Sequence, residues 1–288
     1  TKEMLQEEPE PLRQNRKITD GDDIPTFNDT YDNEFNLSID NYPMSEKSAA
    51  KRLEEFVETS ISDYKELRDI PSLSSTSNLS SSFAIGLISS KQAINQVFSS
   101  SDGTGAGQFA WVNEIIWREF YKYITYHYPH VSKGKSFNPK YDLISWREDE
   151  DSFNKWCEGK TGIPIIDAAM RQLNQTKWMH NRLRMITAMF LSKNLLIDWR
   201  KGERYFMENL IDGDFCSNNG GWQWSASTGV DASPYFRIFN PITQSEKFDP
   251  DGKFIKKFVP ELFDCPSNEI HNPSIETRLS LKYPEMIV

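Results

Sequence analysis

The sequence predicts a mostly α-helical protein with long irregular loops. Three observations support this class: apolar residues recur with helical spacing in several long segments, no segment alternates like a strand, and no G-x-G-x-x-G turn or internal repeat is present. Of the 288 residues, 38% are hydrophobic, including 8 Trp, 11 Tyr and 18 Phe. This content is enough for a folded core and excludes a disordered chain.

The chain divides into a polar beginning and a helical remainder. Residues 1–42 are acidic, contain prolines and show no sustained period, so we expect a linker or meandering loop there, and one helical domain over residues 43–288. Ser45 is the expected N-cap of a first helix, which contains the amphipathic stretch AAKRLEEFVETSI. The residues expected on its buried face are Ala50, Leu53, Phe56 and Val57.

Further helices follow in order. After Pro71, a Ser-rich and then apolar segment is typical of a loop that leads into a buried helix. A long amphipathic helix is predicted over FAWVNEIIWREFYKYITYHYP, and an irregular stretch then extends to Lys160. The next helix, IPIIDAAMRQLNQ, is expected to be capped by Thr161. Two more should run from about His180 to Ile197 and from near Asp198.

The charge is unevenly distributed along the chain. The formal net charge of −9 is unusual for a nucleic-acid binder, which gains affinity by neutralising phosphates. Residues 1–75 hold eighteen of the 42 acidic and nine of the 33 basic residues, which leaves 24 of each for residues 76–288. A basic face in the second part is therefore compatible with the acidic total.

Cysteines and hydropathy restrict the location of the protein. Cys157, Cys216 and Cys265 are odd in number, widely spaced and without a metal-ligand pattern, which disfavours a disulfide framework or a zinc site. No apolar run is long enough to span a bilayer, and TKEMLQEEPEPLR lacks the apolar core of a signal peptide. We expect a cytoplasmic protein, or a nuclear one in a eukaryote, that is monomeric and part of a longer polypeptide.

The chemistry-bearing residues concentrate in one segment. No metal site, phosphate loop or nucleophile elbow is present, and the 4 His are scattered, so ordinary hydrolytic chemistry is disfavoured. The segment IDGDFCSNNGGWQWSASTGVDASPYFRIFNP is dense in polar and aromatic residues and too irregular for a single helix. Polar loops of this kind commonly bind a ligand.

This segment and the one before it resemble a known family. The stretches TGIPIIDAAMRQLNQTKWMHNRLRMITAMFLSKNLLIDWR, GERYFMENLIDGDF and NNGGWQWSASTGVDASPYFRIFNP are similar to the DNA photolyase and cryptochrome family. The likeness extends less densely back to Tyr64 and forward to Asp264, and is strongest with class I photolyases that repair cyclobutane pyrimidine dimers. The family's amino-terminal α/β antenna domain is absent from this chain. We therefore expect the antenna pigment to bind elsewhere, on the rest of the full-length polypeptide.

The resemblance implies a U-shaped FAD enclosed by helices. Its phosphate side would contact Tyr64, Thr76, Ser77, Asn78, Leu79 and Ser80, together with Trp111 and Arg118. Hydroxyls and free backbone N–H groups at a helix start form an anion site, which suits a pyrophosphate. Asn78 departs from the family, in which many relatives carry Arg. Without the resemblance, this Ser-rich stretch is more simply a flexible turn and helix cap.

The resemblance also implies a set of residues around the flavin ring. Asp212, Gly213 and Asp214 would lie against it, with Arg184 paired to Asp212. Asn218 would face the ring nitrogen that is protonated on reduction, and its amide can donate or accept as the redox state changes. In the simpler alternative, the two aspartates cap a following helix and Arg184 is a surface cation.

Three tryptophans match the family's electron-transfer chain. Trp146, Trp199 and Trp222 would carry an electron from the surface to an oxidised flavin. Indole rings suit stepwise transfer because their aromatic systems lose an electron transiently, and burial excludes water. The alternative is that all three are ordinary core aromatics.

The implied substrate is DNA that contains pyrimidine dimers. The dimer would flip into a pocket beside the flavin, where Glu114 would stabilise the radical anion of the lesion. The other residues expected to contact the lesion or the DNA are Arg68, Trp117, Tyr121, Asn181, Arg182, Met185, Trp224 and Gln244. In the simpler alternative, Glu114 and Arg118 form an ordinary i,i+4 pair on an amphipathic helix.

The implied activity is light-driven repair. Excited, fully reduced FAD would donate an electron to the dimer, the cyclobutane ring would open, and the electron would return without net redox change. Two other functions remain open: a cryptochrome-type sensory flavoprotein, and a non-catalytic module that stacks single-stranded nucleic acid on its aromatic residues.

Overall fold

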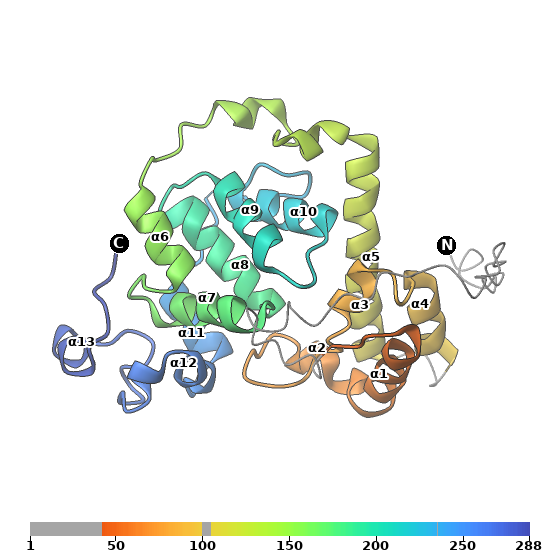
Figure 1. The fold of residues 1–288 in the computed structure, drawn as a ribbon, viewed down its shortest axis with the longest axis horizontal. Coiled ribbons are helices and arrows are strands. Elements are labelled where there is room, and N and C mark those ends of the chain that lie inside the picture. Colours follow the sequence, from red (N-terminus) through yellow and green to blue (C-terminus); the bar gives the residue numbers. More distant parts are fainter. Residues whose placement is uncertain (1–41, 100–104, 235) are drawn as a thin grey trace, which may run out of the picture.

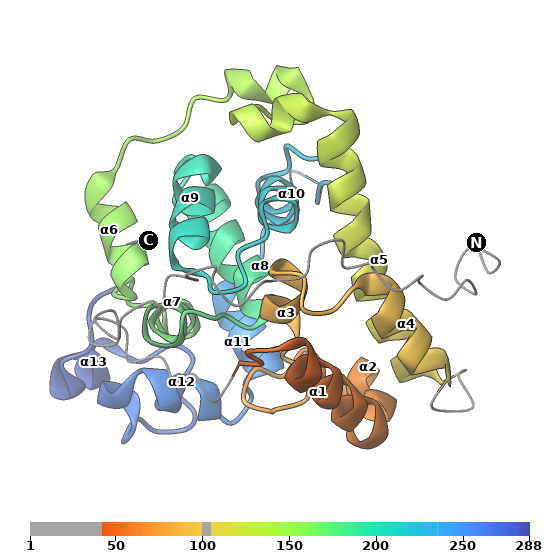
Figure 2. The ribbon, with the colours of Figure 1, turned by 45° about the vertical axis from the view of Figure 1, so that its right-hand side comes forward.

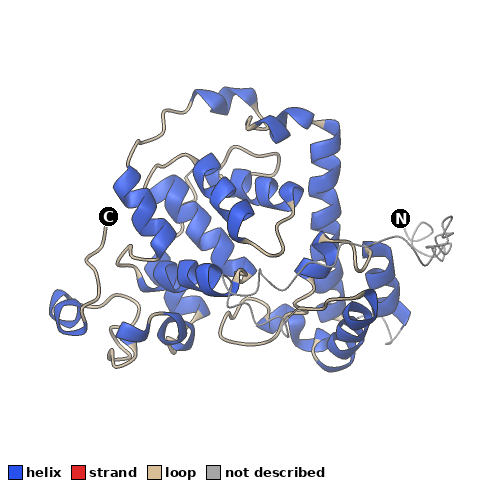
Figure 3. Ribbon diagram, viewed as in Figure 1, coloured by secondary structure: helices blue, strands red, loops and turns tan. Residues whose placement is uncertain are grey.

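The computed structural model describes residues 42–99, 105–234 and 236–288. Within these ranges the chain forms helices and loops, with no strand (Figure 3). The mostly α class predicted from the sequence is therefore confirmed. The linker predicted for residues 1–42 lies outside the described residues, except for Tyr42. None of the described helices is both long and apolar enough to cross a membrane.

The described residues form thirteen α-helices, four short 3₁₀ turns and one π-helix, which are connected by loops. The α-helices are α1 (Glu46–Thr59), α2 (Tyr64–Leu67), α3 (Ser80–Ala84), α4 (Ser90–Ser99), α5 (Ala106–His127), α6 (Glu150–Glu158), α7 (Pro164–Thr176), α8 (Asn181–Met189), α9 (Trp199–Asn209), α10 (Phe215–Ala226), α11 (Pro241–Phe248), α12 (Lys253–Phe258) and α13 (Ile275–Leu281). The 3₁₀ turns are η4 (Ile61–Asp63), η5 (Pro129–Lys133), η6 (Pro139–Leu143) and η8 (Pro260–Leu262), and η7 (Phe190–Asn194) is a π-helix.

One hydrophobic core lies under the first helices. We call it the amino-terminal core, and its buried residues are Ala49, Leu53, Phe56, Val57, Ile61, Tyr64, Leu79, Phe83, Ile88, Ala93, Ile94, Val97, Trp111, Val112 and Ile115. These residues come from α1, the first half of α5 and the segments between them. This core therefore forms from one continuous part of the sequence, at the lower right in Figure 1.

A second core occupies the rest of the molecule. This carboxyl-terminal core contains the buried residues from Trp156 to Tyr283, and several of its largest side chains are completely enclosed. Among these are Trp156, Phe190, Trp199, Phe206 and Phe254. Gly202 brings α9 close to α10, because a Cβ atom at this position would lie 2.2 Å from the Trp222 ring.

The two cores meet where α10 packs against α5, α8 and α9. The segment from α5 to α6 passes over the top of the molecule, and α9 and α10 lie below it, between α5 and α6 (Figures 1 and 2). At this seam Gly220 of α10 faces Tyr121 of α5, and a Cβ atom at Gly220 would lie 2.1 Å from that ring. Only glycine allows this close approach.

Several predicted helix ends are confirmed. Ser45 is the N-cap of α1 and forms a capping box with Ser48. Asp198 is the N-cap of α9, where its side chain accepts from the Arg200 amide. His180 is the N-cap of α8.

Other predictions about the helices are wrong. Ala49 rather than Ala50 belongs to the buried face of α1. Thr161 does not cap the next helix, which begins at Pro164; its hydroxyl instead donates to Asp167 at 2.7 Å. The stretch before Lys160 is not wholly irregular, because it contains α6.

The helix predicted up to Ile197 also changes character. Its α-helical part ends at Met189, and the π-helix Phe190–Asn194 follows. Lys193 in this π-helix donates to three oxygens of the loop after α10: the Ser233 hydroxyl at 3.1 Å, the Pro234 carbonyl at 3.3 Å and the Arg237 carbonyl at 2.9 Å. All three ammonium donors are thereby used to hold that loop.

Candidate active site

A cavity of about 500 Å³ opens at the seam between the two cores. Its wall contains most of the site residues predicted from the sequence: Arg68, Ser80, Glu114, Trp117, Arg118, Tyr121, Asn181, Arg182, Arg184, Met185, Asp212, Asp214, Asn218, Trp222 and Trp224. Residues separated by up to 156 positions in the printed sequence thus face one space. The structure therefore brings these predicted residues together around one cavity.

Other predicted residues do not line this cavity. They are Tyr64, Thr76, Ser77, Asn78, Leu79, Trp111, Trp146, Trp199, Gly213 and Gln244. Those from Thr76 to Leu79 precede Ser80 in the loop before α3, and the indole N–H of Trp111 donates to the Ser77 hydroxyl at 3.4 Å. Tyr64 is buried in the amino-terminal core, and Gln244 lies on α11.

Seven residues of the wall were not predicted from the sequence. These are Ala188, Phe206, Leu210, Ser217, Gly221, Ser225 and Asp231. Most are small or apolar and lie on or beside α8, α9 and α10. Their spacing along these helices was the only feature of the sequence that could have placed them in the wall. Asp231 comes from the loop after α10 and carried no signal in the sequence beyond its place in the polar segment.

The predicted pair between Arg184 and Asp212 is present. Nη2 of Arg184 lies 3.0 and 2.8 Å from the two carboxylate oxygens of Asp212, and Nε donates to the Met179 carbonyl at 2.8 Å. The Asp212 side chain is almost completely buried, which strengthens the attraction between these charges. Arg184 is therefore a fixed part of the cavity wall and not a surface cation.

Asp214 both caps a helix and forms an ion pair. Its side chain accepts from the Ser217 amide at 2.9 Å at the start of α10. Its other oxygen lies 3.4 Å from Arg118, whose guanidinium also donates to the Phe83 carbonyl at 2.8 Å. The capping alternative is thus correct for Asp214, and the ion pair joins the two cores.

Glu203 of α9 supports the two asparagines of the NNGGWQW motif. Asn218 donates from its amide to the Glu203 carbonyl at 2.9 Å, and Asn219 donates to the Glu203 carboxylate at 3.4 Å. Burial raises the pKa of Glu203. The sequence analysis did not identify this residue, because nothing in the local pattern indicates that it faces α10.

Glu114 pairs with Arg68 and not with Arg118. The Arg68 guanidinium donates to its carboxylate at 2.5 Å. Trp117 and Tyr121 lie one and two turns further along α5, with ring centroids 6.1 Å apart. Burial raises the pKa of the Tyr121 hydroxyl to about 12, and the nearby carboxylates of Asp231 and Glu114 act in the same direction.

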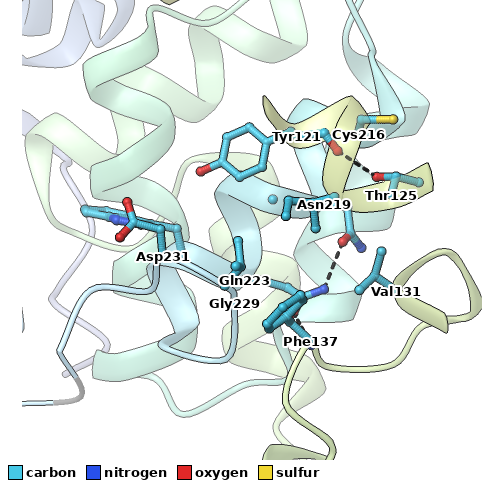
Figure 4. Close-up of a pocket in the computed structure, with 13 residues that line it drawn as sticks. Tyr121, Thr125, Val131, Phe137, Cys216, Asn219, Gln223, Gly229 and Asp231 are labelled. Atoms are coloured by element: carbon cyan, nitrogen blue, oxygen red, sulfur yellow. Dashed lines mark hydrogen bonds between the residues drawn. The ribbon is translucent and has the colours of Figure 1, made fainter. Parts of the chain in front are cut away.

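A much smaller cavity lies next to the first. Its volume is about 20 Å³, enough for one water molecule, and it shares Tyr121, Trp224 and Asp231 with the larger cavity. Figure 4 shows Gln223 in its wall, bonded to the Phe137 amide at 2.8 Å. This bond joins the segment between η5 and η6 to α10.

The three predicted electron-transfer tryptophans belong to the carboxyl-terminal core. Trp222 lines the cavity, Trp199 is fully buried, and Trp146 is partly buried against the same core. The Trp222 ring contacts Phe206 at 5.0 Å and Trp156 at 6.0 Å between centroids. Trp156 is a further buried indole that the sequence analysis did not include.

The cavity wall suits a large ligand that carries phosphate groups as well as an aromatic ring system. Arg118, Arg184 and Ser80 offer donors on one part of the wall, while Phe206, Leu210 and Trp222 offer apolar surface on another. Three buried polar atoms in or next to the wall have no hydrogen-bond partner among the described residues: the indole nitrogen of Trp222 and the hydroxyls of Ser81 and Ser82. A dinucleotide with a fused ring system matches this combination.

Comparison with known proteins decides the family. Residues 111–288 match the model of the FAD binding domain of DNA photolyase.

The chain belongs to the DNA photolyase family.

Photolyases with similar sequences are found in bacteria and fungi. The deoxyribodipyrimidine photo-lyase of Escherichia coli (strain K12) is 50% identical over 254 residues, which cover 86% of this chain and 53% of the relative. The deoxyribodipyrimidine photo-lyase of Neurospora crassa is 50% identical over 265 residues, which cover 86% of this chain and 43% of the relative. The chain thus spans about half the length of the curated photolyases it matches.

Solved structures agree with this assignment. A class III photolyase from Agrobacterium tumefaciens superposes with a TM-score of 0.81 and 43% identity, over 86% of this chain and 54% of the other. A Synechocystis cryptochrome superposes with a TM-score of 0.79 and 31% identity, over 88% of this chain and 56% of the other. The predicted photolyase-type helical domain and the predicted FAD cofactor are confirmed at the level of the family.

Proposed function

We propose that this chain is the catalytic part of a light-driven enzyme that repairs cyclobutane pyrimidine dimers in DNA. The observation that carries the proposal is that a single cavity is lined by both implied sets of residues. Arg184, Asp212 and Asn218 belong to the flavin set, and Glu114, Trp117, Met185 and Trp224 to the lesion set. A cofactor and an extruded base would therefore be neighbours.

The flavin side depends on charge and hydrogen bonding. When bound, reduced FAD supplies the light-excited electron that opens the dimer. Arg184 is held by Asp212 and Met179, so its position is fixed before any ligand enters. Asn218 is anchored to the Glu203 carbonyl through its amide nitrogen, which leaves its amide oxygen as an acceptor for the ring. Arg118 and the residues from Thr76 to Ser80 would face the phosphates.

The lesion side depends on one carboxylate and several flat or flexible surfaces. Arg68 holds Glu114 in place, and that carboxyl group would bind the thymine edge of the flipped dimer. Trp117, Met185 and Trp224 supply apolar surface that suits an unstacked base. Tyr121 and Asn181 complete this part of the wall.

The duplex around the lesion would contact the rim of the cavity. Arg68 and Arg182 line the cavity and offer guanidinium donors for phosphates. Gln244, on α11, would contact a flanking base or phosphate. The tryptophans Trp146, Trp199 and Trp222 would deliver electrons to an oxidised cofactor. Residues 43–288 would form the repair domain, with residues 1–42 as its linker to an antenna domain.

Two findings support repair over signalling. The relatives at 50% identity are named deoxyribodipyrimidine photo-lyase, whereas the cryptochrome structure is 31% identical. The lesion set is also assembled around one cavity, which a sensory protein does not need.

The direct experiment measures repair under light. The purified full-length protein should be yellow or blue from bound flavin, and should remove dimers from irradiated DNA under near-ultraviolet or blue light. The control is the same mixture kept in the dark. Equal repair in the dark, or a protein that stays colourless after reconstitution with FAD, would refute the proposal.

A substitution tests the tryptophan chain separately. Trp222→Phe should slow photoreduction of the oxidised cofactor, because phenylalanine is much harder to oxidise than tryptophan. Repair by enzyme that has already been reduced chemically should be largely retained. Loss of both activities would contradict the assigned role of Trp222.

A further inference from the structure

Four side chains of alternating charge lie in a row at the cavity. Arg68 pairs with Glu114 at 2.5 Å and lies 4.0 Å from Asp69, and Arg182 lies 2.6 Å from the other oxygen of Asp69. The row links α5, the end of α2 and the start of α8. Asp69 is its one member that does not line the cavity.

The row is shielded from solvent. The exposed fractions of the four side chains lie between 17% and 32%, so salt screens these pairs less than it screens surface pairs. The Arg182 guanidinium also lies over the Phe248 ring at 4.6 Å. Its position is therefore set by Asp69 on one side and by an aromatic ring on another.

We propose that Asp69 is a specificity-determining positioning residue, which acts through Arg182 and Arg68 to suppress binding of undamaged DNA. The proposal rests on the proposed function. A free guanidinium binds any DNA phosphate, whereas a paired one must exchange its carboxylate for the phosphate and gains much less. A lesion that enters the cavity fixes the duplex by its own contacts with the wall, so that both guanidiniums keep Asp69 as their partner and donate only their remaining N–H groups to the DNA. Release of a guanidinium therefore adds little to the affinity for the dimer duplex. Asp69 thus acts as a built-in competitor for the phosphate.

A simpler alternative is that Asp69 only fastens the end of α2 to α8. In that case its removal would weaken binding of all DNA equally, or would loosen the fold. The two alternatives therefore predict changes of opposite sign in the affinity for undamaged DNA.

The test compares two duplexes of one sequence, with and without a single dimer. Binding to full-length protein loaded with FAD is measured in the dark at several salt concentrations. For Asp69→Asn we expect affinity for the undamaged duplex to rise about tenfold, with a salt dependence steeper by about one phosphate contact. Affinity for the dimer duplex should rise less than about threefold, so the preference for damage falls. Asp63→Asn is the matched control, because it removes an exposed carboxylate from the same segment.

Two more variants identify the route of the effect. In an Arg182→Gln background, Asp69→Asn should change the affinity for undamaged DNA less than about twofold, because Arg182 is absent and Arg68 stays paired with Glu114. Asp69→Glu retains the charge and should retain most of the preference.

The contrary outcomes are distinct. An Asp69→Asn protein that loses its flavin, or that loses affinity for both duplexes equally, would assign a structural role and overturn the proposal. An unchanged preference in Asp69→Asn would overturn it as well. If the wild-type protein itself showed no preference for the dimer duplex, the proposed function would fail first.

Discussion

The amino-terminal core and the carboxyl-terminal core contribute different chemistry to one cavity. The first core is built from neighbouring segments of the sequence, and its helix α5 carries Glu114, Trp117 and Tyr121 to the wall. The second is built from α6 to α13 and encloses Trp156, Trp199 and Trp222. The carboxylate proposed to bind the lesion thus belongs to one region, and the candidate electron-transfer residues belong to the other.

This difference indicates how the functions can be separated by mutation. Changes in the carboxyl-terminal core should alter stability and photoreduction together, because the tryptophans proposed to transfer electrons are also packing residues of that core. Changes on α5 should alter recognition of the lesion. Residues at the seam, such as His180 and Asp214, should affect both regions through their relative placement.

The largest expected effect is in the carboxyl-terminal core. Trp156→Ala should lower the free energy of unfolding by about 4 kcal/mol, since it leaves a cavity beside four aromatic rings. The indole stacks on Phe153 and on Phe206, and it meets Tyr205 and Trp222 edge-on. Urea denaturation measures the change, with the partly exposed Trp178→Ala as the control. Equal losses for both variants would show that this core is less tightly packed than the structure indicates.

A smaller effect is expected at the seam when the pH is lowered. Burial lowers the pKa of the His180 imidazole from 6.5 to about 4. The unfolded chain therefore binds the proton first, and the free energy of unfolding falls as the pH drops from about 6.5 to about 4. Above that range the imidazole is neutral in both states and costs no stability. Across the range, the free energy of unfolding falls by roughly 3 kcal/mol.

The comparison is with His180→Asn, which keeps an acceptor for the Arg182 amide but does not titrate. Urea denaturation at pH 7 and pH 4.5 should show a steeper loss for the wild type than for the variant. Parallel losses in the two proteins would show that other groups cause the acid sensitivity.

The smallest effect is expected for the ion pair that joins the cores. Asp214→Ala removes the α10 cap and the pair with Arg118, whereas Asp214→Asn removes only the pair. Without cofactor, Asp214→Ala should be less stable than Asp214→Asn by about 1 kcal/mol, the usual contribution of an N-cap. Thermal unfolding measures the difference. If Asp214→Asn were itself less stable than the wild type by more than about 1 kcal/mol, the ion pair, and not the cap, would be the main link between the two cores.

Local signals predicted the elements that depend on neighbouring residues. The cap at Ser45 and the helix start near Asp198 were recognisable because a cap bonds to residues two or three positions away. The same reasoning should have found α6, which Asp149 caps and Gly159 ends in a left-handed conformation. Its polar sequence concealed it, because only one narrow face is buried.

Other features depend on contacts between distant parts of the chain. Nothing near Phe190 indicates the extra residue per turn of a π-helix. The pair between Asp69 and Arg182 joins residues 113 positions apart, and the role of Glu203 depends on how α9 lies against α10. The resemblance supplied the candidate members of the site and the pair between Arg184 and Asp212, but Asp69 and Glu203 as partners were visible only in three dimensions.

The contact of Gly220 with the Tyr121 ring sets how closely α10 approaches α5 at the seam. A single hydrogen atom separates α10 from α5 here, and these helices carry Trp222 and Glu114. One added methyl group would move the two halves of the cavity apart. Since electron tunnelling weakens steeply with distance, Gly220→Ala would slow the proposed electron transfer, although position 220 takes no chemical part in it.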